Sequence, residues 1–187
     1  MSIISIVFYV LIIFMVISSI KEIPQRIRNL KHGKKALLYL FLTIPILLVT
    51  LIGSIIVSEY IPILKLGWLG YKIIFGPSLN SNTETTTLLS IIPTLSIFIF
   101  AMFACLIFNY YEEKEFRKKW IHVPLWAVLH LIMGIPIYAI IPIFSVGIIY
   151  KHIYDKYSLD HAYTAHFATN IVIIGIVIVS LIYSVVT

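Results

Sequence analysis

Five long stretches without a charged side chain constrain this chain more than any other feature. Residues 1–20, 36–58, 85–111, 121–150 and 161–187 contain no Lys, Arg, Asp or Glu. A helix needs about 20 consecutive apolar residues to cross a bilayer, and each stretch reaches that length. Only 12% of the residues are charged, whereas soluble domains have roughly 25%. The sequence therefore excludes a water-soluble globule and predicts an all-α, polytopic integral membrane helix bundle.

The charge and the cysteine content limit the partners that this chain can have. The formal net charge is +6, but basic residues that flank hydrophobic runs set membrane topology. The predicted partner is therefore the lipid bilayer, and no nucleic-acid partner is expected. Cys105 is the only cysteine, so neither a disulfide framework nor a cysteine-based zinc site is expected. Residues 1–20 lack a basic start and a small-x-small cleavage site, and they are expected to be a retained first span rather than a signal peptide.

The distribution of Lys and Arg predicts how the chain crosses the membrane. Residues 21–35 carry six basic residues and one Glu, and the positive-inside rule places such a segment in the cytoplasm. The first helix then starts outside, and a second helix over about 36–57 returns there. The segment 58–87 has few basic residues and several aromatic ones, which suits an outer interfacial position. A third helix from near Thr87 leads back to the basic residues around 114–119.

The stretch 123–150 is either one kinked helix or two short ones, because a Gly and a Pro interrupt it. Two helices keep the basic segment 151–160 in the cytoplasm, so a turn near 134–138 is predicted. A last helix over about 160–186 completes about six transmembrane helices with both termini outside, most simply in the cell membrane. Residues 1–187 are expected to form a single membrane-embedded domain.

Polar side chains inside the apolar helices are the candidate functional residues. An ionisable group within a span is unfavourable unless it is paired or lines a wet cavity. Glu113 and Arg117 are four residues apart on one helix face, with the acid first, and are predicted to form an ion pair. Glu112 has Phe116 rather than a basic residue four positions later. Glu112 is therefore the unpaired carboxylate.

Counting along the helices places four polar side chains in one layer. A hairpin midpoint near residue 121 lies nine residues from both Glu112 and His130, so an antiparallel pair holds them at the same depth. His166 lies six residues into the last helix, and Asn170 follows one turn later on the same face. Each histidine alone is ordinarily a packing residue or an interhelical hydrogen bond. Their shared depth, about 10 Å below the cytoplasmic surface, favours a site.

One free carboxylate, two imidazoles and an amide suit the hydrolysis of a peptide by activated water. The carboxylate removes a proton from water with the help of an imidazole, and donors stabilise the oxyanion. The same carboxylate and histidines also form a possible zinc site with an open water position, and the residues alone leave both chemistries open. The sequence contains no HExxH motif, and no Ser or Cys is paired with a histidine in this layer.

Three motifs occur in order in this part of the chain. They are EEKEFR at 112–117, which matches EExxxR, WAVLH at 126–130, which approximates FxxxH, and HFATN at 166–170, which matches HxxxN. In that order they resemble the CAAX prenyl protease and bacteriocin-processing family (CPBP, also called Abi) of intramembrane glutamate endopeptidases. The resemblance covers about residues 108–175, within an expected catalytic core of about 88–187.

The resemblance implies a metal-independent endopeptidase without a cofactor, acting on a peptide or membrane-protein substrate. It assigns the general base to Glu112, water activation to His130, and the oxyanion site to His166 and Asn170. The Glu113–Arg117 pair and Trp126 support these residues. Two departures concern this chain: Trp126 stands where the family usually has Phe, and the 18 residues from Glu112 to His130 form a shorter interval than the family generally has.

Two other classes of function fit the same polar layer. One is a non-enzymatic membrane protein, such as an immunity or peptide-binding protein, in which these groups bind a peptide or hold the bundle together. The other is a small proton-coupled transporter with a Glu/His relay. Loss of cleavage in a folded Glu112→Gln variant would indicate the enzyme, and uptake driven by a pH gradient would indicate the transporter.

Overall fold

The computed structural model describes residues 3–67 and 88–186, and every regular element in these ranges is helical. This confirms the predicted all-α class. The α-helices are α1 (Ile3–Ser18), α2 (Ile23–His32), α3 (Leu40–Tyr60), α6 (Leu88–Phe116), α7 (His122–Leu129), α8 (Ile140–Lys156) and α9 (Leu159–Val186). Short 3₁₀ helices join them: η1 (Ile20–Glu22), η2 (Lys34–Tyr39), η3 (Pro62–Lys65), η4 (His130–Met133) and η5 (Ile137–Ala139).

Among the described residues, three helical segments are long and apolar enough to cross a membrane. They are Lys34–Tyr60, Ile137–Lys156 and Leu159–Ser180. The first of them exposes large apolar side chains, with Phe41 83% and Val49 69% accessible. A soluble monomer does not carry continuous apolar surfaces of this kind. These segments indicate an integral membrane protein.

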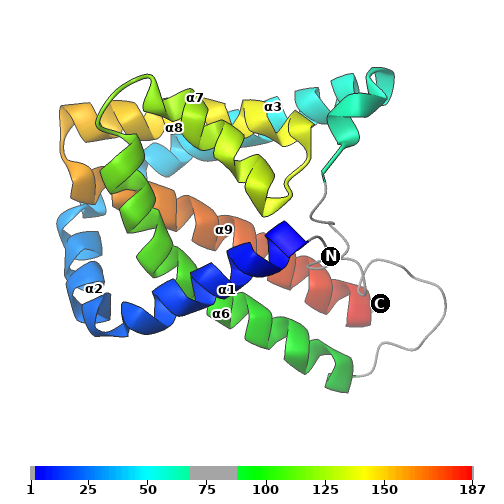
Figure 1. Ribbon diagram of the computed structural model, residues 1–187, viewed down its shortest axis with the longest axis horizontal. Helices are drawn as coiled ribbons and strands as arrows, with labels where there is room; N and C mark the ends of the chain where they lie inside the picture. Colours follow the sequence, from blue (N-terminus) through cyan, green and yellow to red (C-terminus); the bar gives the residue numbers. More distant parts are fainter. Residues whose placement is uncertain (1–2, 68–87, 187) are drawn as a thin grey trace.

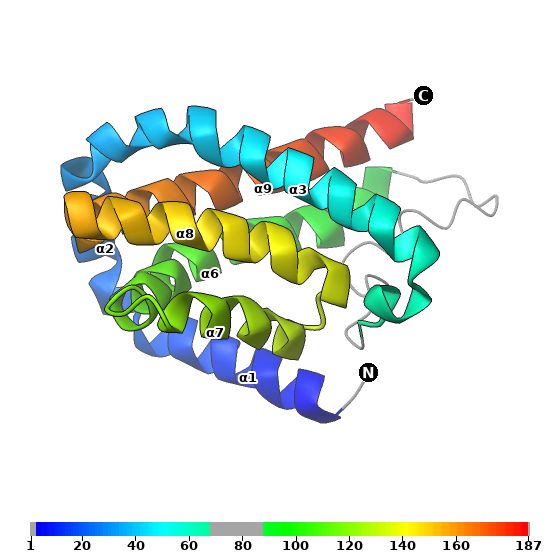
Figure 2. The same ribbon diagram turned by 90° about the horizontal axis from the view of Figure 1, so that it is seen from above.

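The helices pack as an elongated bundle. Helix α6 packs on α9, α3 packs on α8, and α8 also contacts α7 and α9. Figures 1 and 2 show α2, the α6–α7 turn and the α8–α9 turn at one end of the bundle, and the end of α9 and the start of α6 at the other. The basic segments around 21–35 and 114–119 therefore lie at the same end.

Pro and Gly residues mark the ends of two helical segments. Helix α2 has Pro24 in its first turn and is capped at its end by Gly33, as these residues favour. The predicted turn near 134–138 is confirmed, because η4 ends at Gly134, whose φ of 85° lies in the left-handed region. Glycine adopts that conformation without a steric penalty. The chain then reverses into η5 and α8.

Other predicted elements differ from the structure. Helix α1 has 16 residues, fewer than the about 20 that a span needs, because the polar residues after Ser18 begin a 3₁₀ turn. The predicted fourth helix, 123–135, is α-helical only to Leu129 and continues as η4. The basic segment 21–35 is itself largely helical, as α2. Most of the predicted interfacial segment, residues 68–87, lies outside the described residues.

Helix α8 lies close to the residues of the predicted site. A Cβ atom on Gly147 would lie 2.9 Å from a ring carbon of Trp126, so only glycine allows this approach. Trp126 and Tyr150 belong to the hydrophobic core cluster, together with Ala36, Val146, Ile149, Ile153, Ala162 and Ala165. The core of the bundle therefore forms one wall of the site.

Candidate active site

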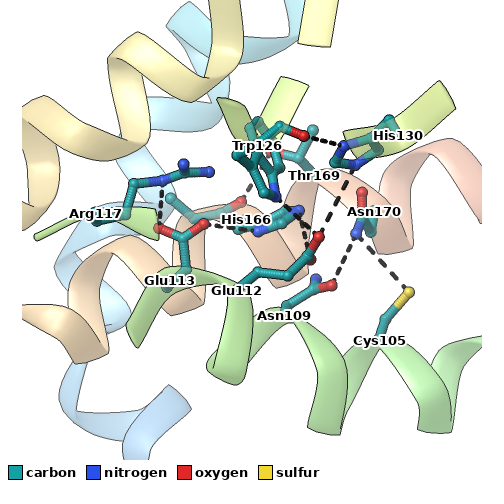
Figure 3. Close-up of polar contacts among 11 residues, drawn as sticks. Cys105, Asn109, Glu112, Glu113, Arg117, Trp126, His130, His166, Thr169 and Asn170 are labelled. Atoms are coloured by element: carbon teal, nitrogen blue, oxygen red, sulfur yellow. Dashed lines mark hydrogen bonds and ion pairs between the residues drawn. The ribbon is translucent and has the colours of Figure 1, made fainter. Parts of the chain in front are cut away.

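Glu112 lies at the centre of the polar layer, near the end of α6 (Figure 3). The indole N–H of Trp126 donates to its Oε1 at 2.8 Å. Nε2 of His130 lies 3.9 Å from Oε1, and Nε2 of His166 lies 3.9 Å from Oε2. The expected convergence of Glu112, His130 and His166 is therefore present, and the two histidines approach opposite oxygens of the same carboxylate.

The hydrogen bonds of the two histidines fix how their rings face Glu112. Nδ1 of His130 lies 2.8 Å from the backbone oxygen of Trp126, and Nδ1 of His166 lies 2.9 Å from Oε1 of Glu113. Both partners only accept, so each Nδ1 carries the proton in the bond. Each Nε2 is then left to face the Glu112 carboxylate.

The predicted pair of Glu113 and Arg117 is confirmed, since Nε of Arg117 donates to Oε2 of Glu113 at 3.0 Å. Both side chains are fully buried. The other oxygen of Glu113 accepts from His166. Glu113 therefore does more than neutralise Arg117, because it also orients a histidine of the site.

Trp126 connects Arg117 to Glu112. The guanidinium carbon of Arg117 lies 4.0 Å from the centre of the indole ring, a cation–π arrangement. Nη1 and Nη2 of Arg117 have no hydrogen-bond partner among the described residues, and this ring contact is their principal compensation. Trp126 also meets His130 edge to face, with 4.6 Å between ring centres, so it packs directly against His130.

Tyr150 on α8 closes another side of the layer. Its ring stacks on His166 with 4.8 Å between ring centres and 22° between the planes, and it is buried. The stacking and the Glu113 hydrogen bond hold the His166 ring from two directions. The sequence does not identify Tyr150 as a residue of the site, because a lone tyrosine carries no motif.

Asn170 lies in the same layer, but it faces α6 rather than the two histidines. Its Nδ2 donates to Oδ1 of Asn109 at 3.2 Å and lies 3.8 Å from Sγ of Cys105. Figure 3 shows Asn170 and Asn109 pointing toward each other. Sequence reasoning missed Asn109, although it stands three residues before Glu112 on the same helix.

The part of the chain that the structure describes contains no group of three or more His, Cys, Asp or Glu side chains arranged to hold a metal ion. The other histidines lie away from the layer. His32 and His152 are exposed, and His122 and His161 are half-buried. Ser145 on α8 donates to the backbone oxygen of Ile141 on its own helix, so its hydroxyl is not paired with a histidine of the layer.

Comparison with known proteins gives no match: no protein-family model, no curated protein and no solved structure matches this chain. The chemistry of the site must therefore be argued from its own residues.

Proposed function

We propose that this chain is an intramembrane endopeptidase, which hydrolyses a peptide bond of a membrane-associated protein or peptide with water activated by Glu112. The observation that supports this most is the pair of 3.9 Å distances between the Glu112 oxygens and the two Nε2 atoms. Such a distance is too long for a direct hydrogen bond. It suits one bridging water.

The reaction begins with a water molecule between Glu112 and a histidine. Glu112 removes a proton from this water, and the water oxygen bonds to the carbonyl carbon of the scissile peptide. The π electron pair of the carbonyl moves onto its oxygen, and donors on the other side of the site stabilise the charge. The intermediate then expels the amine, which takes the proton from Glu112, and a carboxylic acid and an amine result.

The buried network gives each participant a fixed orientation. Trp126 holds one oxygen of Glu112, and Glu113 holds His166. Fixed dipoles around a reaction centre stabilise a transition state without reorganisation at the moment of reaction. The three motifs and their order, which resemble the glutamate endopeptidases of the CPBP family, support the same assignment without a catalytic metal.

The proposal includes a topology. The three long spans and α6, together with two shorter segments, α1 and α7–η4, make six crossings of the cell membrane, with both termini outside. The bilayer is locally thinner around the two shorter segments. The site then opens toward the cytoplasm, because it lies near the end of the bundle that carries the basic segments. The substrate reaches this layer from the bilayer or from its cytoplasmic surface.

A comparison of membrane-associated peptides in three cell populations tests the proposal. The cells carry wild type, Glu112→Gln or the matched control Glu115→Gln. The control changes an exposed glutamate of α6 that is paired with Lys118, just after the helix. We expect cleavage products in wild type and the control that are missing with Glu112→Gln. Identical peptides in all three populations would contradict an endopeptidase and leave a binding protein or a transporter.

Replacing Trp126 with Phe is expected to lower kcat about tenfold while the protein still folds. The variant keeps an aromatic ring beside His130 but loses the N–H that donates to Glu112. A hydrogen bond to a charged group contributes about 1.5–3 kcal/mol, and 1.4 kcal/mol is a factor of ten. Peptide cleavage by the purified variant measures this, with Trp120→Phe, at an exposed position, as the control. An unchanged kcat would show that the indole N–H does not orient the base.

Prolonged chelation is expected to leave the activity intact. Among the described residues, no group of three or more His, Cys, Asp or Glu side chains is arranged to hold a metal ion, and one oxygen of Glu112 is engaged by Trp126. The family that the motifs resemble also works without a catalytic metal. The measurement is peptide cleavage before and after dialysis against a strong chelator, and after zinc is added back. Loss of cleavage on chelation, with recovery on adding zinc, would instead show that Glu112 and the histidines bind a metal.

A further inference from the structure

Asn109 is a buried residue with an unused hydrogen-bond donor. Only 2% of its surface is accessible. Its Oδ1 accepts from Asn170, but its Nδ2 has no hydrogen-bond partner among the described residues. Buried amide groups in folded proteins are nearly always paired. An unpaired one beside the polar layer therefore indicates a group that the protein meets only when it binds something.

The position of Asn109 relates it to the reaction centre. It precedes Glu112 by three residues and Glu113 by four on α6, and helix positions at these spacings are neighbours on one side. In Figure 3 the Asn109 side chain extends from α6 toward α9, as that of Glu112 does. Asn109 lies one turn farther from the cytoplasmic end of α6 than the base.

The hydrogen bond between the two amides decides which of them has a donor to offer. Asn170 directs its Nδ2 to Oδ1 of Asn109, with Sγ of Cys105 as a second neighbour. The Nδ2 donor of Asn170 is thus bonded to a residue of α6, whereas the Nδ2 donor of Asn109 has no hydrogen-bond partner among the described residues. The same bond fixes the plane of the Asn109 amide.

We infer that Asn109 is a further catalytic residue, whose Nδ2–H donates to the carbonyl oxygen of the scissile peptide, with Asn170 as its positioning residue. This inference rests on the proposed function. As the water oxygen bonds to the carbonyl carbon, the π pair moves onto the oxygen and the hydrogen bond from Asn109 strengthens. No proton leaves Asn109 in this step. The oxyanion donor is then an amide that the motifs do not include.

The test measures cleavage of a quenched-fluorescence peptide library with apolar tails by purified wild type, Asn109→Ala, Asn170→Ala and the double variant. Removing one oxyanion donor lowers kcat by about 10²–10³-fold, and we expect that loss for Asn109→Ala with little change in KM. Its unfolding temperature should fall only slightly, because the lost Nδ2 donor has no partner and the lost Oδ1 accepts only the one bond from Asn170. Asn109→Leu, of similar size, is a second variant with the same expected loss.

The double variant separates the two roles. If Asn109 donates and Asn170 positions it, Asn109→Ala loses at least as much kcat as Asn170→Ala, and the double variant is no worse than Asn109→Ala. Cys105→Ala, which removes the other contact of the Asn170 amide, should cleave like wild type.

Two results would overturn the inference while the proposed function stands. One is wild-type kcat in folded Asn109→Ala and Asn109→Leu. The other is a smaller loss for Asn109→Ala than for Asn170→Ala, with the double variant equal to Asn170→Ala, which would make Asn109 only the positioning residue. Failure of wild type to cleave any peptide above the Glu112→Gln background would overturn the proposed function itself.

Discussion

Purified Glu112→Gln is expected to fold, to bind substrate and to lose cleavage by about 10²–10⁴-fold, the range that general base catalysis supplies. The amide cannot take a proton from water at neutral pH. Its oxygen still accepts from the indole N–H of Trp126, which donates at 2.8 Å in the wild type, so the local packing should survive. The measurements are kcat, substrate binding and the unfolding temperature in the same detergent.

Two controls identify the cause of that loss. Glu115→Gln removes the same charge three residues further along the chain, at an exposed position paired with Lys118, and should cleave like wild type. The second control is Glu112→Asp, which keeps a carboxylate at position 112 on a side chain that is one methylene shorter. This variant should recover part of the kcat that Glu112→Gln loses. Normal cleavage by a folded Glu112→Gln would exclude Glu112 as the base.

The depth of the site could be predicted because helix geometry is regular. Glu112 and His130 each lie nine residues from residue 121, the hairpin midpoint that the sequence predicts, and a constant rise per residue brings them level. The structure places His130 within 3.9 Å of Glu112. The helix face also predicted the Glu113–Arg117 pair, because residues four apart meet on any regular helix.

The contacts across helices could not be predicted in this way. The bond from Trp126 to Glu112, the bond from Glu113 to His166 and the contact of Asn109 with Asn170 depend on how the helices rotate against each other. Apolar membrane helices have no polar face to fix that rotation in the sequence. Only the departure of Trp126 from the Phe of the motif hinted that a donor stands there.

The membrane class could be predicted, whereas the number of spans stays a prediction. The charge-free runs 36–58, 121–150 and 161–187 overlap the helical segments Lys34–Tyr60, Ile137–Lys156 and Leu159–Ser180, which are long and apolar enough to cross a bilayer. In α1 and in the α7–η4 segment, the apolar run continues beyond the helix, because Ser and Gly residues end the regular turns. Hydropathy depends on composition and does not indicate the residue at which a helix ends.

Glu113→Gln is expected to destabilise the protein and also to lower its activity. The wild-type carboxylate accepts from two donors, Nε of Arg117 and Nδ1 of His166, and is fully buried. Glutamine offers one acceptor oxygen, and its NH₂ group then faces a second donor. Breaking a buried charged pair costs about 3–5 kcal/mol, which corresponds to a fall of roughly 10 °C in unfolding temperature. The freed His166 ring should lower kcat in the molecules that remain folded.

Exchanging the two charges shows whether Glu113 and Arg117 only neutralise each other. A simple pair would tolerate Glu113→Arg with Arg117→Glu and regain much of its stability. Here the exchange removes the acceptor for His166 and places a carboxylate over the Trp126 ring, where the arginine carbon now lies 4.0 Å from the centre. The negative face of an aromatic ring repels an anion, so the exchanged protein should be no more stable than Glu113→Gln. Wild-type unfolding temperature in the exchanged protein would show that Glu113 and Arg117 only neutralise each other. A folded but inert Glu113→Gln beside a normally active Glu112→Gln would reverse the assignment of the two glutamates.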